Sequence, residues 1–361
     1  MTSIMNKLTL VLLASALALA GCKTKEGGKA AVEAKPVTWK MASTFAGTLP
    51  ILGTGGVYFS DTLNKITSGR VDIKFFDPGK LVPALEVFDA TSKGAIDAAW
   101  SAAGYWTGKV PSAVFFAAMP FGPDTTEYLA WIYHGGGWDL WKEIYAKSNI
   151  MPIPCGIIPP EASGWFRDPI TKLEQFKGMK IRFYGIGGQA MQKLGASVQL
   201  LAGGDIYPAL ERGVLDATEF SMPSIDQKLG FNKISKHYYF PGWHQQASLM
   251  ELIINMEKWK SLSEADQTLI KVVCRDTIVQ EVTEGEHQQG AALSAFRADG
   301  VQIHVWPDNI LKGFEKAFNE VVEEQRKADA DFSKVYDSYT AYRKNYKEWA
   351  KLSRLPASYN P

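Results

Sequence analysis

The sequence predicts an α/β protein with two similar lobes and a cleft between them, on three observations. Strand-like and helical segments alternate from Val37 onwards, which is typical of parallel strands joined by crossover helices. A helix, a glycine and a strand follow one another twice, around Gly94 and around Gly213. The chain of 361 residues, of which 46% are hydrophobic, is also long enough for two domains.

The expected elements follow from hydrophobic periodicity and from the glycines that end helices. In the first unit we expect strands and helices in the order 37–41, 49–66, 71–76, 84–93 and 95–100. In the second unit we expect a strand, a helix and a strand at 180–184, 206–212 and 214–220. Ligands of such sheets bind beyond the carboxyl ends of the strands. We therefore expect Trp100 to Tyr105 and Glu219 to Pro223 at the cleft.

The C-terminal region predicts one or two long helices. Apolar residues recur with a 3.6-residue period from Ile310 to Val322, and an apolar stripe continues from Phe332 to Trp349. No proline interrupts the stripe before Pro356. Its aromatic residues suit either a brace between the lobes or an interface with a partner subunit.

The N-terminus predicts export with a lipid anchor. Lys7 precedes an apolar run at 8–20, which is too short to span a bilayer comfortably and is typical of a signal peptide. The run ends in Leu19-Ala20-Gly21-Cys22, the pattern of a bacterial lipobox. We expect a signal peptide at 1–21, lipidation of Cys22 and a flexible tether at 22–36, with ordinary cleavage and an unmodified Cys22 as the alternative.

Two cysteines remain, Cys155 and Cys274, which are far apart in the sequence. In an oxidising compartment they could pair, and they could equally be two buried thiols. The sequence leaves both alternatives open, and we favour unpaired core residues.

Charge and motifs exclude several function classes. The 39 Lys and Arg residues balance 38 Asp and Glu residues to a net charge of +1, so we expect no nucleic-acid partner. The chain has none of the metalloprotease, serine-hydrolase, CxxC or Walker motifs, and its five histidines lack metal-ligand spacing. We therefore do not expect a hydrolase or a zinc enzyme.

One motif points to a different function. Gly185-Ile186-Gly187-Gly188-Gln189-Ala190 follows a predicted strand and resembles a dinucleotide fingerprint, with Asp205 about twenty residues later. An exported nicotinamide-dependent oxidoreductase is therefore one alternative. The other interpretation is a tight turn that lets a helix approach the strand, with Asp205 as the N-cap of the next helix. A carbohydrate receptor is a further alternative, because the chain has 11 Trp and 14 Tyr residues.

Arg182 is the first candidate ligand residue. It lies on a short predicted strand beside the glycine turn, and its planar guanidinium can donate two hydrogen bonds to one carboxylate. Arg167, in Gly164-Trp165-Phe166-Arg167, is a second candidate. Composition alone favours the alternative that each is an ordinary surface or ion-paired arginine.

Several segments resemble a known family. They are Lys177 to Arg182, Ala202 to Gly213 (AGGDIYPALERG), Asp216 to Glu219 and Tyr239 to Trp243 (YFPGW). They are similar to the extracytoplasmic solute-binding proteins of TRAP transporters (DctP-like). Within that family they resemble the branch that binds 2-oxo acids such as pyruvate, often labelled mannitol/chloroaromatic-type. The similarity extends from about Val37 to the C-terminus.

The resemblance implies a two-lobed periplasmic-binding-protein fold, type II-like, with a hinge and long C-terminal helices. Lobe I is expected at 37–164 and 245–285, and lobe II at 165–244 and 286–361. Closure of the lobes would capture a small 2-oxo or 2-hydroxy monocarboxylate for a membrane permease. Some relatives use the C-terminal helix in a swapped dimer, so a homodimer is also an expectation. The implied location is the periplasm, with anchoring through Cys22.

The resemblance also implies a ligand set. Arg182 would clamp the substrate carboxylate, with Arg167 near the pocket. A sodium or calcium ion would bridge protein and substrate, held by Glu161, Glu219, Gln245 and the carbonyl of Phe220. Relatives have Gln and Glu where this chain has Glu161 and Gln245, so the number of carboxylates is unchanged, and they usually have Trp at Phe220. Pocket walls are expected from four aromatic residues: Trp100, Tyr105, Phe220 and Trp243.

Overall fold

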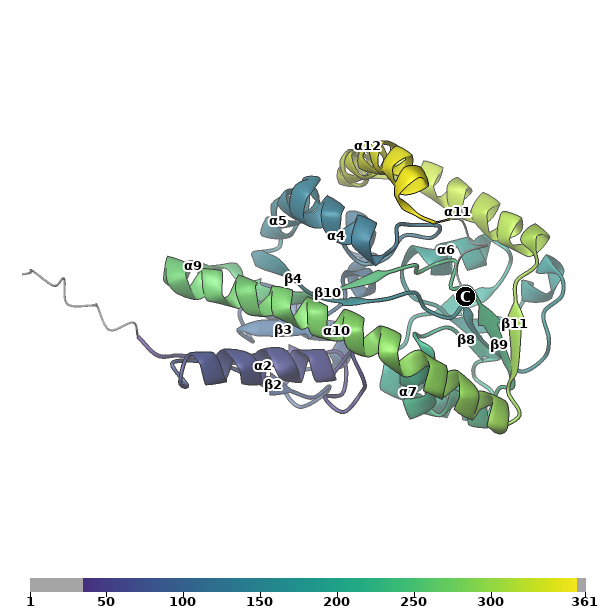
Figure 1. Ribbon diagram of the computed structural model, residues 1–361, viewed down its shortest axis with the longest axis horizontal. Coiled ribbons are helices and arrows are strands. Elements are labelled where there is room, and N and C mark those ends of the chain that lie inside the picture. The colour runs from purple at the N-terminus through teal and green to yellow at the C-terminus, as the bar shows by residue number, and fades with distance from the viewer. Residues whose placement is uncertain (1–34, 356–361) are drawn as a thin grey trace, which may run out of the picture. The chain divides into compact units, whose positions relative to one another are not determined.

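The computed structural model describes residues 35–355. The predicted signal peptide, Cys22 and nearly all of the predicted tether lie outside the described residues. Within that range the chain forms two mixed β-sheets covered by helices (Figure 1). We call the part built on the first sheet lobe I and the part built on the second sheet lobe II. The predicted α/β class with two lobes is confirmed.

Lobe I contains a five-stranded sheet in the order β2-β1-β3-β10-β4. Its strands are β1 (Val37–Ser43), β2 (Val71–Phe76), β3 (Ala98–Ser101), β4 (Ile150–Ile158) and β10 (Ser248–Asn255). The first three strands are parallel, as predicted, because helices connect them. β10 runs antiparallel to both β3 and β4. The chain leaves lobe I through β4 and returns through β10, which explains the opposite direction of these neighbours.

Lobe II contains a six-stranded sheet in the order β11-β9-β5-β8-β6-β7. Its strands are β5 (Gly164–Phe166), β6 (Lys180–Arg182), β7 (Ser197–Gln199), β8 (Ala217–Thr218), β9 (His237–Phe240) and β11 (Gln302–Val305). β6 is parallel to β7 and β8, whereas β5 is antiparallel to β8 and β9. The entering and leaving strands of this lobe, β5 and β9, are therefore also antiparallel neighbours.

Helices cover the faces of both sheets. The α-helices are α2 (Thr54–Ile66), α3 (Val87–Ser92), α4 (Thr125–His134), α5 (Gly137–Ala146), α6 (Gly185–Lys193), α7 (Gly203–Glu211), α8 (Pro223–Leu229), α9 (Met256–Ser261), α10 (Glu264–Ala298), α11 (Asp308–Ala328) and α12 (Ala330–Ser353). Short 3-10 helices are η1 (Ala84–Glu86), η2 (Ala103–Trp106), η3 (Pro111–Phe116), η4 (Leu173–Phe176) and η5 (Phe231–Lys233).

Both predicted helix–glycine–strand units are present. Gly94 follows α3 with a φ of 73°, and Gly213 follows α7 with a φ of 70°. Glycine adopts this left-handed conformation without the steric penalty of a side chain. The prediction for Asp205 was wrong, because α7 begins two residues earlier and Asp205 lies inside its first turn.

Two connections and one helix join the lobes. The connections are 159–163, between β4 and β5, and 241–247, between β9 and β10. The long helix α10 contacts β4 and α2 of lobe I and α8 of lobe II. It extends along both lobes (Figure 1). These segments are the natural hinge of the molecule, because they carry the chain from one sheet to the other.

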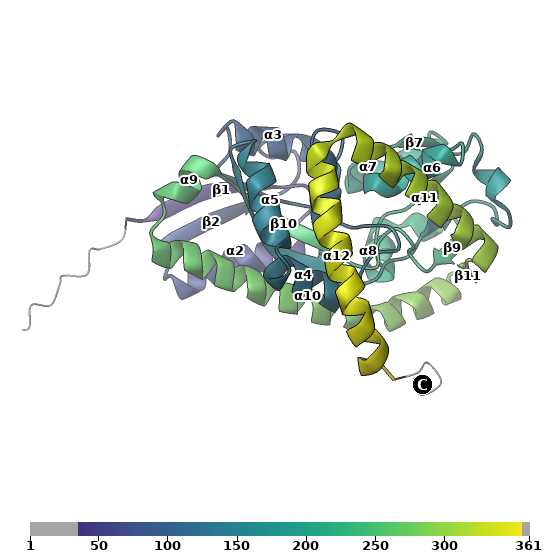
Figure 2. The same ribbon diagram turned by 90° about the horizontal axis from the view of Figure 1, so that it is seen from above.

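The C-terminal helices also link the two lobes. α11 packs against α6 of lobe II, whereas α12 packs against η3, α5 and α4 of lobe I. Figure 2 shows α12 beside α4 and α5, with α11 on the side of α6. We had expected all of 286–361 in lobe II, and the contacts of α12 differ from that expectation. The other lobe boundaries stay a proposal.

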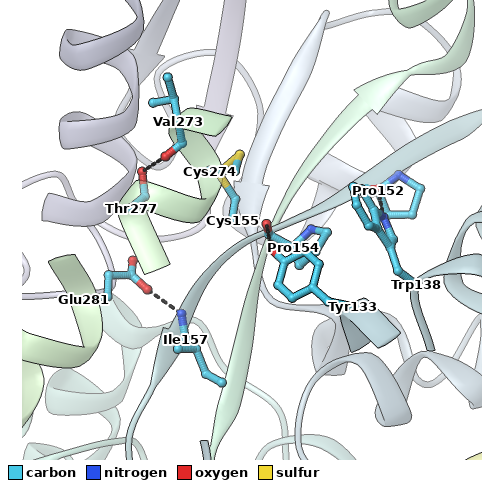
Figure 3. The surroundings of a disulfide bond; sticks show 10 residues. All are labelled: Tyr133, Trp138, Pro152, Pro154, Cys155, Ile157, Val273, Cys274, Thr277 and Glu281. Carbon is cyan, nitrogen blue, oxygen red and sulfur yellow. Dashed lines mark hydrogen bonds between the residues drawn. A yellow bond between two sulfur atoms is a disulfide. The ribbon is translucent and has the colours of Figure 1, made fainter. Parts of the chain in front are cut away.

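Cys155 and Cys274 form a disulfide that joins β4 to α10 (Figure 3). Our preference for two unpaired thiols was therefore wrong. Two turns further along α10, Glu281 accepts a hydrogen bond from the backbone N–H of Ile157 at 2.7 Å. The disulfide and Glu281 thus hold one face of α10 against β4, a pairing of distant segments that sequence spacing does not reveal.

A buried carboxyl in lobe I predicts how stability changes with pH. Glu251, on β10, accepts a hydrogen bond from Trp106 Nε1, and burial raises its pKa to about 8. The native state therefore keeps a proton that the unfolded chain releases above its ordinary pKa near 4.5. Stability should fall as the pH rises through this window, by at most on the order of 5 kcal/mol.

The variant Glu251→Gln should remove that pH dependence, because its neutral amide keeps an oxygen for Trp106. Urea unfolding at pH 5 and pH 8 measures this effect. At pH 5 we expect the variant and the wild type to have similar free energies of unfolding. At pH 8 the variant should be the more stable protein. Parallel stability curves for the two proteins would contradict this assignment.

Candidate ligand-binding site

A small cavity of about 20 Å³ lies between the lobes, where the two connections pass. Its lining comes from both lobes and from both connections: Phe45, Leu52, Ala102, Tyr105, Ile158, Glu161, Arg182, Tyr184, Phe220, Ser221, Gln245, Ser248 and Met250. This volume holds about one water molecule. A three-carbon acid is larger, so its entry requires the walls or the lobes to move.

Arg182 and Glu219 form a buried ion pair at this cavity. Arg182 ends β6, and Glu219 directly follows the adjacent parallel strand β8. Arg182 Nη1 donates to Glu219 Oε2 at 2.5 Å and to the Glu219 carbonyl oxygen at 2.9 Å. The backbone N–H of Tyr184 donates to Glu219 Oε1 at 2.7 Å. Burial raises the pKa of Glu219 to about 6, against the opposing effect of Arg182.

Glu161 and Gln245 lie opposite each other on the two connections. The backbone N–H of Glu161 donates to the Gln245 carbonyl oxygen at 3.3 Å. Glu161 Oε1 accepts a hydrogen bond from the Ser221 hydroxyl at 2.9 Å. Glu161 Oε2 and Gln245 Oε1 are buried and have no hydrogen-bond partner. Burial, and next the charge of Glu219, hold the pKa of Glu161 well above its usual value.

These oxygens suit a hard cation. Sodium and calcium prefer carboxylate, amide and carbonyl oxygens, and two such oxygens here lack other partners. The predicted set contains only two carboxylates. Residues 35–355 contain no group of three or more His, Cys, Asp or Glu side chains placed to hold a metal. Both carboxylate oxygens of Glu219 already accept a hydrogen bond, so a cation there would use their remaining lone pairs.

Two of the four predicted aromatic residues line the cavity. Tyr105 comes from η2 of lobe I, and burial raises its pKa to about 12, so its phenol stays neutral. Phe220 directly follows Glu219, and its ring centre lies 5.1 Å from the Arg182 guanidinium. Both residues follow strand ends, which is where the sequence placed the cleft.

Trp100 and Trp243 pack in the core and do not line this cavity. Trp100 Nε1 donates to the Leu52 carbonyl oxygen at 2.7 Å, and its ring stacks with Phe59 of α2. The Trp243 ring stacks with Phe314 of α11 at 4.6 Å. In each case the backbone directs the ring toward a helix that covers the sheet. The residue type alone does not predict whether the ring points to that helix or to the cavity.

Arg167 also lies outside the cavity. Its side chain is exposed, its Nη2 donates to the Leu210 carbonyl oxygen, and it borders a separate hollow with Asp168 and Asp216. Arg167 follows β5, whereas Arg182 is the last residue of β6, and only Arg182 is brought to the other candidate residues. The structure therefore gives no support to a ligand role for Arg167.

The sequence analysis missed Tyr184 and gave no role to Ser221. Tyr184 lies two residues after Arg182, and Ser221 lies within the segment that we placed at the cleft. Their positions after strand ends were the available signal.

The glycine motif lets α6 pack closely in lobe II. A Cβ atom at Gly187 would lie 2.7 Å from the Phe183 ring, and one at Gly188 would lie 3.2 Å from Val198. Gly185 has a φ of 62° at the turn from β6 into α6. The tight-turn interpretation therefore accounts for all three glycines.

Comparison with known proteins identifies the family of the chain. Residues 42–328 match the family model described as bacterial extracellular solute-binding protein, family 7. The chain is 32% identical to a monocarboxylate 2-oxoacid-binding periplasmic protein of Nostoc sp. (strain PCC 7120), over 96% of this chain and 95% of that protein.

Two solved structures are also similar. One is a TRAP transporter solute-binding protein from Bordetella bronchiseptica, a dimer with copurified calcium and picolinate at one site and the other site apo. Its TM-score is 0.86 at 29% identity, covering 88% of this chain and 95% of that one. The other, from Pseudoalteromonas atlantica, contains sodium and pyruvate. Its TM-score is 0.84 at 30% identity, covering 88% of this chain and 97% of that one.

No helix within residues 35–355 is both long enough and apolar enough to cross a membrane. The family match covers most of the chain, and the matched solved structures share its two-lobed arrangement. The chain therefore belongs to bacterial extracellular solute-binding protein family 7 and is a TRAP-type solute-binding protein, not an enzyme.

Proposed function

We propose that this protein captures a small 2-oxo or 2-hydroxy monocarboxylate, similar to pyruvate or lactate, together with a bridging sodium or calcium ion. It then delivers the acid to the membrane permease of a TRAP transporter. One observation carries the proposal: the buried Arg182–Glu219 pair lies at the same cavity as two oxygens without partners, Glu161 Oε2 and Gln245 Oε1. The Nostoc relative and the pyruvate-bound structure support the same ligand class.

Arg182 supplies the donors for the ligand carboxylate. Its guanidinium is 1% exposed and keeps its orientation through Glu219 and the Leu201 carbonyl oxygen. A buried arginine held in this way can meet a carboxylate without reorganisation. The net charge of +1 gives no overall attraction for acids, so this placed charge must provide recognition.

The cation would make the site selective for acids that carry a second oxygen next to the carboxylate. A 2-oxo or 2-hydroxy acid can chelate one cation through its carboxylate and its neighbouring oxygen, whereas propionate cannot. The proposed protein ligands are Glu161, Glu219, Gln245 and the carbonyl of Phe220. A cation would also offset the burial of two carboxyls whose pKa values are raised.

The two alternative functions lose their structural support. The glycine motif serves helix packing, and the relatives of this chain are solute-binding proteins. The oxidoreductase hypothesis is therefore left without a nucleotide site. The carbohydrate receptor rested on the number of aromatic residues. Two of the four aromatic residues predicted at the cleft, Trp100 and Trp243, pack against helices and offer no exposed platform.

The location and assembly follow the same proposal. We place the protein in the periplasm, held to a membrane by a lipid on Cys22. We also propose a homodimer through the end of α12, where Trp349, Leu352 and Leu355 are 62%, 80% and 71% exposed. Such an apolar surface suits an interface between subunits.

A thermal-shift experiment with the purified protein tests ligand and cation together. Pyruvate, 2-oxobutyrate and lactate should each raise the melting temperature by several degrees at saturating concentration. Propionate and neutral sugars should have little effect. After chelation in a sodium-free buffer, the pyruvate effect should shrink and should return when sodium or calcium is added. A response to sugars but not to acids would reject the proposal.

A pair of adjacent glutamines provides the matched control for the cation site. Gln245→Ala removes a proposed ligand oxygen, so it should weaken the cation dependence of pyruvate binding. Gln246→Ala removes a side chain that donates to the Gly242 carbonyl oxygen of the same connection. It should leave that cation dependence unchanged. Equal behaviour of the two variants would remove Gln245 from the site.

A further inference from the structure

Tyr184 is fixed in lobe II by the ion pair of the ligand site. It lies between β6 and α6, two residues after Arg182. Its backbone N–H donates to Glu219 Oε1 at 2.7 Å, and Glu219 Oε2 pairs with Arg182. The position of Tyr184 is therefore tied to the residues that would hold the ligand.

The side chain of Tyr184 reaches into lobe I. Its hydroxyl oxygen accepts a hydrogen bond from the backbone N–H of Gly104 at 2.8 Å. Its ring meets the ring of Tyr105 edge to face, with 4.9 Å between the centres. Both residues of the hydrogen bond are buried, and α6 and η2 contact each other across the lobes. Tyr184 thus bridges the two lobes beside the cavity that it helps to line.

The contact with Tyr184 requires a glycine at position 104, whereas the backbone conformation at that position does not. A Cβ atom at position 104 would lie 2.2 Å from Tyr184 Cζ and 2.4 Å from its hydroxyl oxygen. The φ of Gly104 is outside the left-handed region, so any residue could adopt its conformation. The absent side chain therefore serves only to admit the Tyr184 ring.

The lobe I side of the contact is also rigid. Trp106, in the same short helix as Gly104, donates from Nε1 to Glu251 Oε1 of β10 at 2.5 Å. Between them lies Tyr105, a wall of the cavity. Burial keeps the pKa of Tyr184 well above its usual value, so the hydroxyl stays neutral at physiological pH. Both ends of the bridge are thus fixed when the lobes are closed.

We propose that Tyr184 and Gly104 form an interlobe latch that slows release of the ligand, and that the Tyr184 ring limits the length of the acid that fits. This inference rests on the proposed function, because it names the positioning and specificity residue of the same site. Opening the lobes must break the hydrogen bond and withdraw the ring from above Gly104. The latch therefore acts on the dissociation rate and on the choice of ligand.

The variant Tyr184→Phe removes only the hydroxyl. We expect pyruvate to dissociate about three to ten times faster in stopped-flow measurements, which is the effect of one buried hydrogen bond. Tyr239→Phe is the matched control, because the Tyr239 hydroxyl accepts from the Ile170 N–H at 2.7 Å within lobe II. That variant should lower stability without changing dissociation. Equal dissociation rates in wild type and Tyr184→Phe would overturn the latch.

A size-compensation test examines the contact itself. Gly104→Ala should weaken pyruvate binding at least tenfold, because the new methyl group clashes with Tyr184 in the closed form. Gly108→Ala, where a Cβ atom meets nothing within 4 Å, is the control and should bind normally. Combining Gly104→Ala with Tyr184→Ala should restore part of the lost affinity. Failure of the double variant to recover any affinity, while it remains folded by circular dichroism, would contradict the contact.

The length limit is tested by the ligand series. Tyr184→Ala should improve binding of 2-oxobutyrate and longer 2-oxo acids relative to pyruvate, whereas wild type should favour pyruvate. An unchanged order of ligands would overturn the specificity role. If wild type binds no acid at all, the proposed function fails, and this result is distinct from failure of the latch in a protein that does bind.

Discussion

Replacing Arg182 by alanine is expected to abolish the stabilisation of the protein by pyruvate. The Arg182 guanidinium is the positively charged side chain at the cavity. It donates hydrogen bonds to the Glu219 carboxylate and to two carbonyl oxygens. Removing the partner of one buried charge typically loses about 3 kcal/mol or more. For binding this corresponds to more than a hundredfold in affinity. Isothermal titration with pyruvate measures the loss directly.

The same substitution also affects the protein without ligand, because Glu219 loses its ion-pair partner. A folded but less stable protein is therefore expected, and Glu219 should take up a proton more readily. Arg182→Lys avoids that problem, since it keeps the positive charge near Glu219 and removes the planar pair of donors. We expect it to fold and to bind pyruvate at least tenfold more weakly.

Arg167→Ala is the matched control for both variants. Arg167 belongs to the same lobe, is exposed and donates to the backbone carbonyl of Leu210, and neither residue lines the cavity. Its removal should leave pyruvate affinity unchanged. If Arg182→Lys binds pyruvate as tightly as wild type, or if Arg167→Ala loses binding, the assignment of the carboxylate clamp is wrong.

Reduction of the Cys155–Cys274 disulfide is expected to destabilise the protein strongly. The bond closes a loop between residues 119 positions apart. Loop-closure entropy for that length predicts a stabilisation of about 5 kcal/mol as an upper bound. The bond also holds α10 to β4, and α10 spans both lobes. We expect a reductant to lower the melting temperature by about 10 °C.

The double variant Cys155→Ala with Cys274→Ala is the control for reagent effects. Its melting temperature should already be low and should not respond to the reductant. Thiol titration of the unfolded, unreduced protein should find no free thiol from these two positions. Detection of both thiols, together with no response of wild type to the reductant, would contradict the disulfide.

Local patterns in the sequence predicted much of the fold. The positions of β1 to β3, the strand–helix junction at α6 and both helix-ending glycines follow from patterns within a few residues. The parallel direction of β1 to β3 follows from the helices that connect them. The candidate residues Arg182, Glu219 and Phe220 could be predicted for a related reason. Arg182 is the last residue of β6, Glu219 and Phe220 directly follow β8, and the carboxyl ends of these parallel strands meet at one edge of the sheet.

The direction in which a side chain points was harder to predict from the sequence. Trp100 and Tyr105 were both expected at the cleft, but only Tyr105 lines it. Successive side chains of a strand point to opposite faces. The face that is covered by α2 therefore takes Trp100 into the core, and no local pattern shows which face a later helix will cover.

The sequence by itself determined that this is a two-lobed α/β binding protein of the solute-binding family, with an arginine and two carboxylates near its cleft. Only the tertiary structure decided that Cys155 pairs with Cys274, that α12 returns to lobe I and that Tyr184 reaches Gly104. Each of these contacts joins segments at least 80 residues apart. Such contacts depend on how whole elements pack and on where the chain crosses between the lobes. The residues next to one partner in the sequence therefore do not predict the other partner.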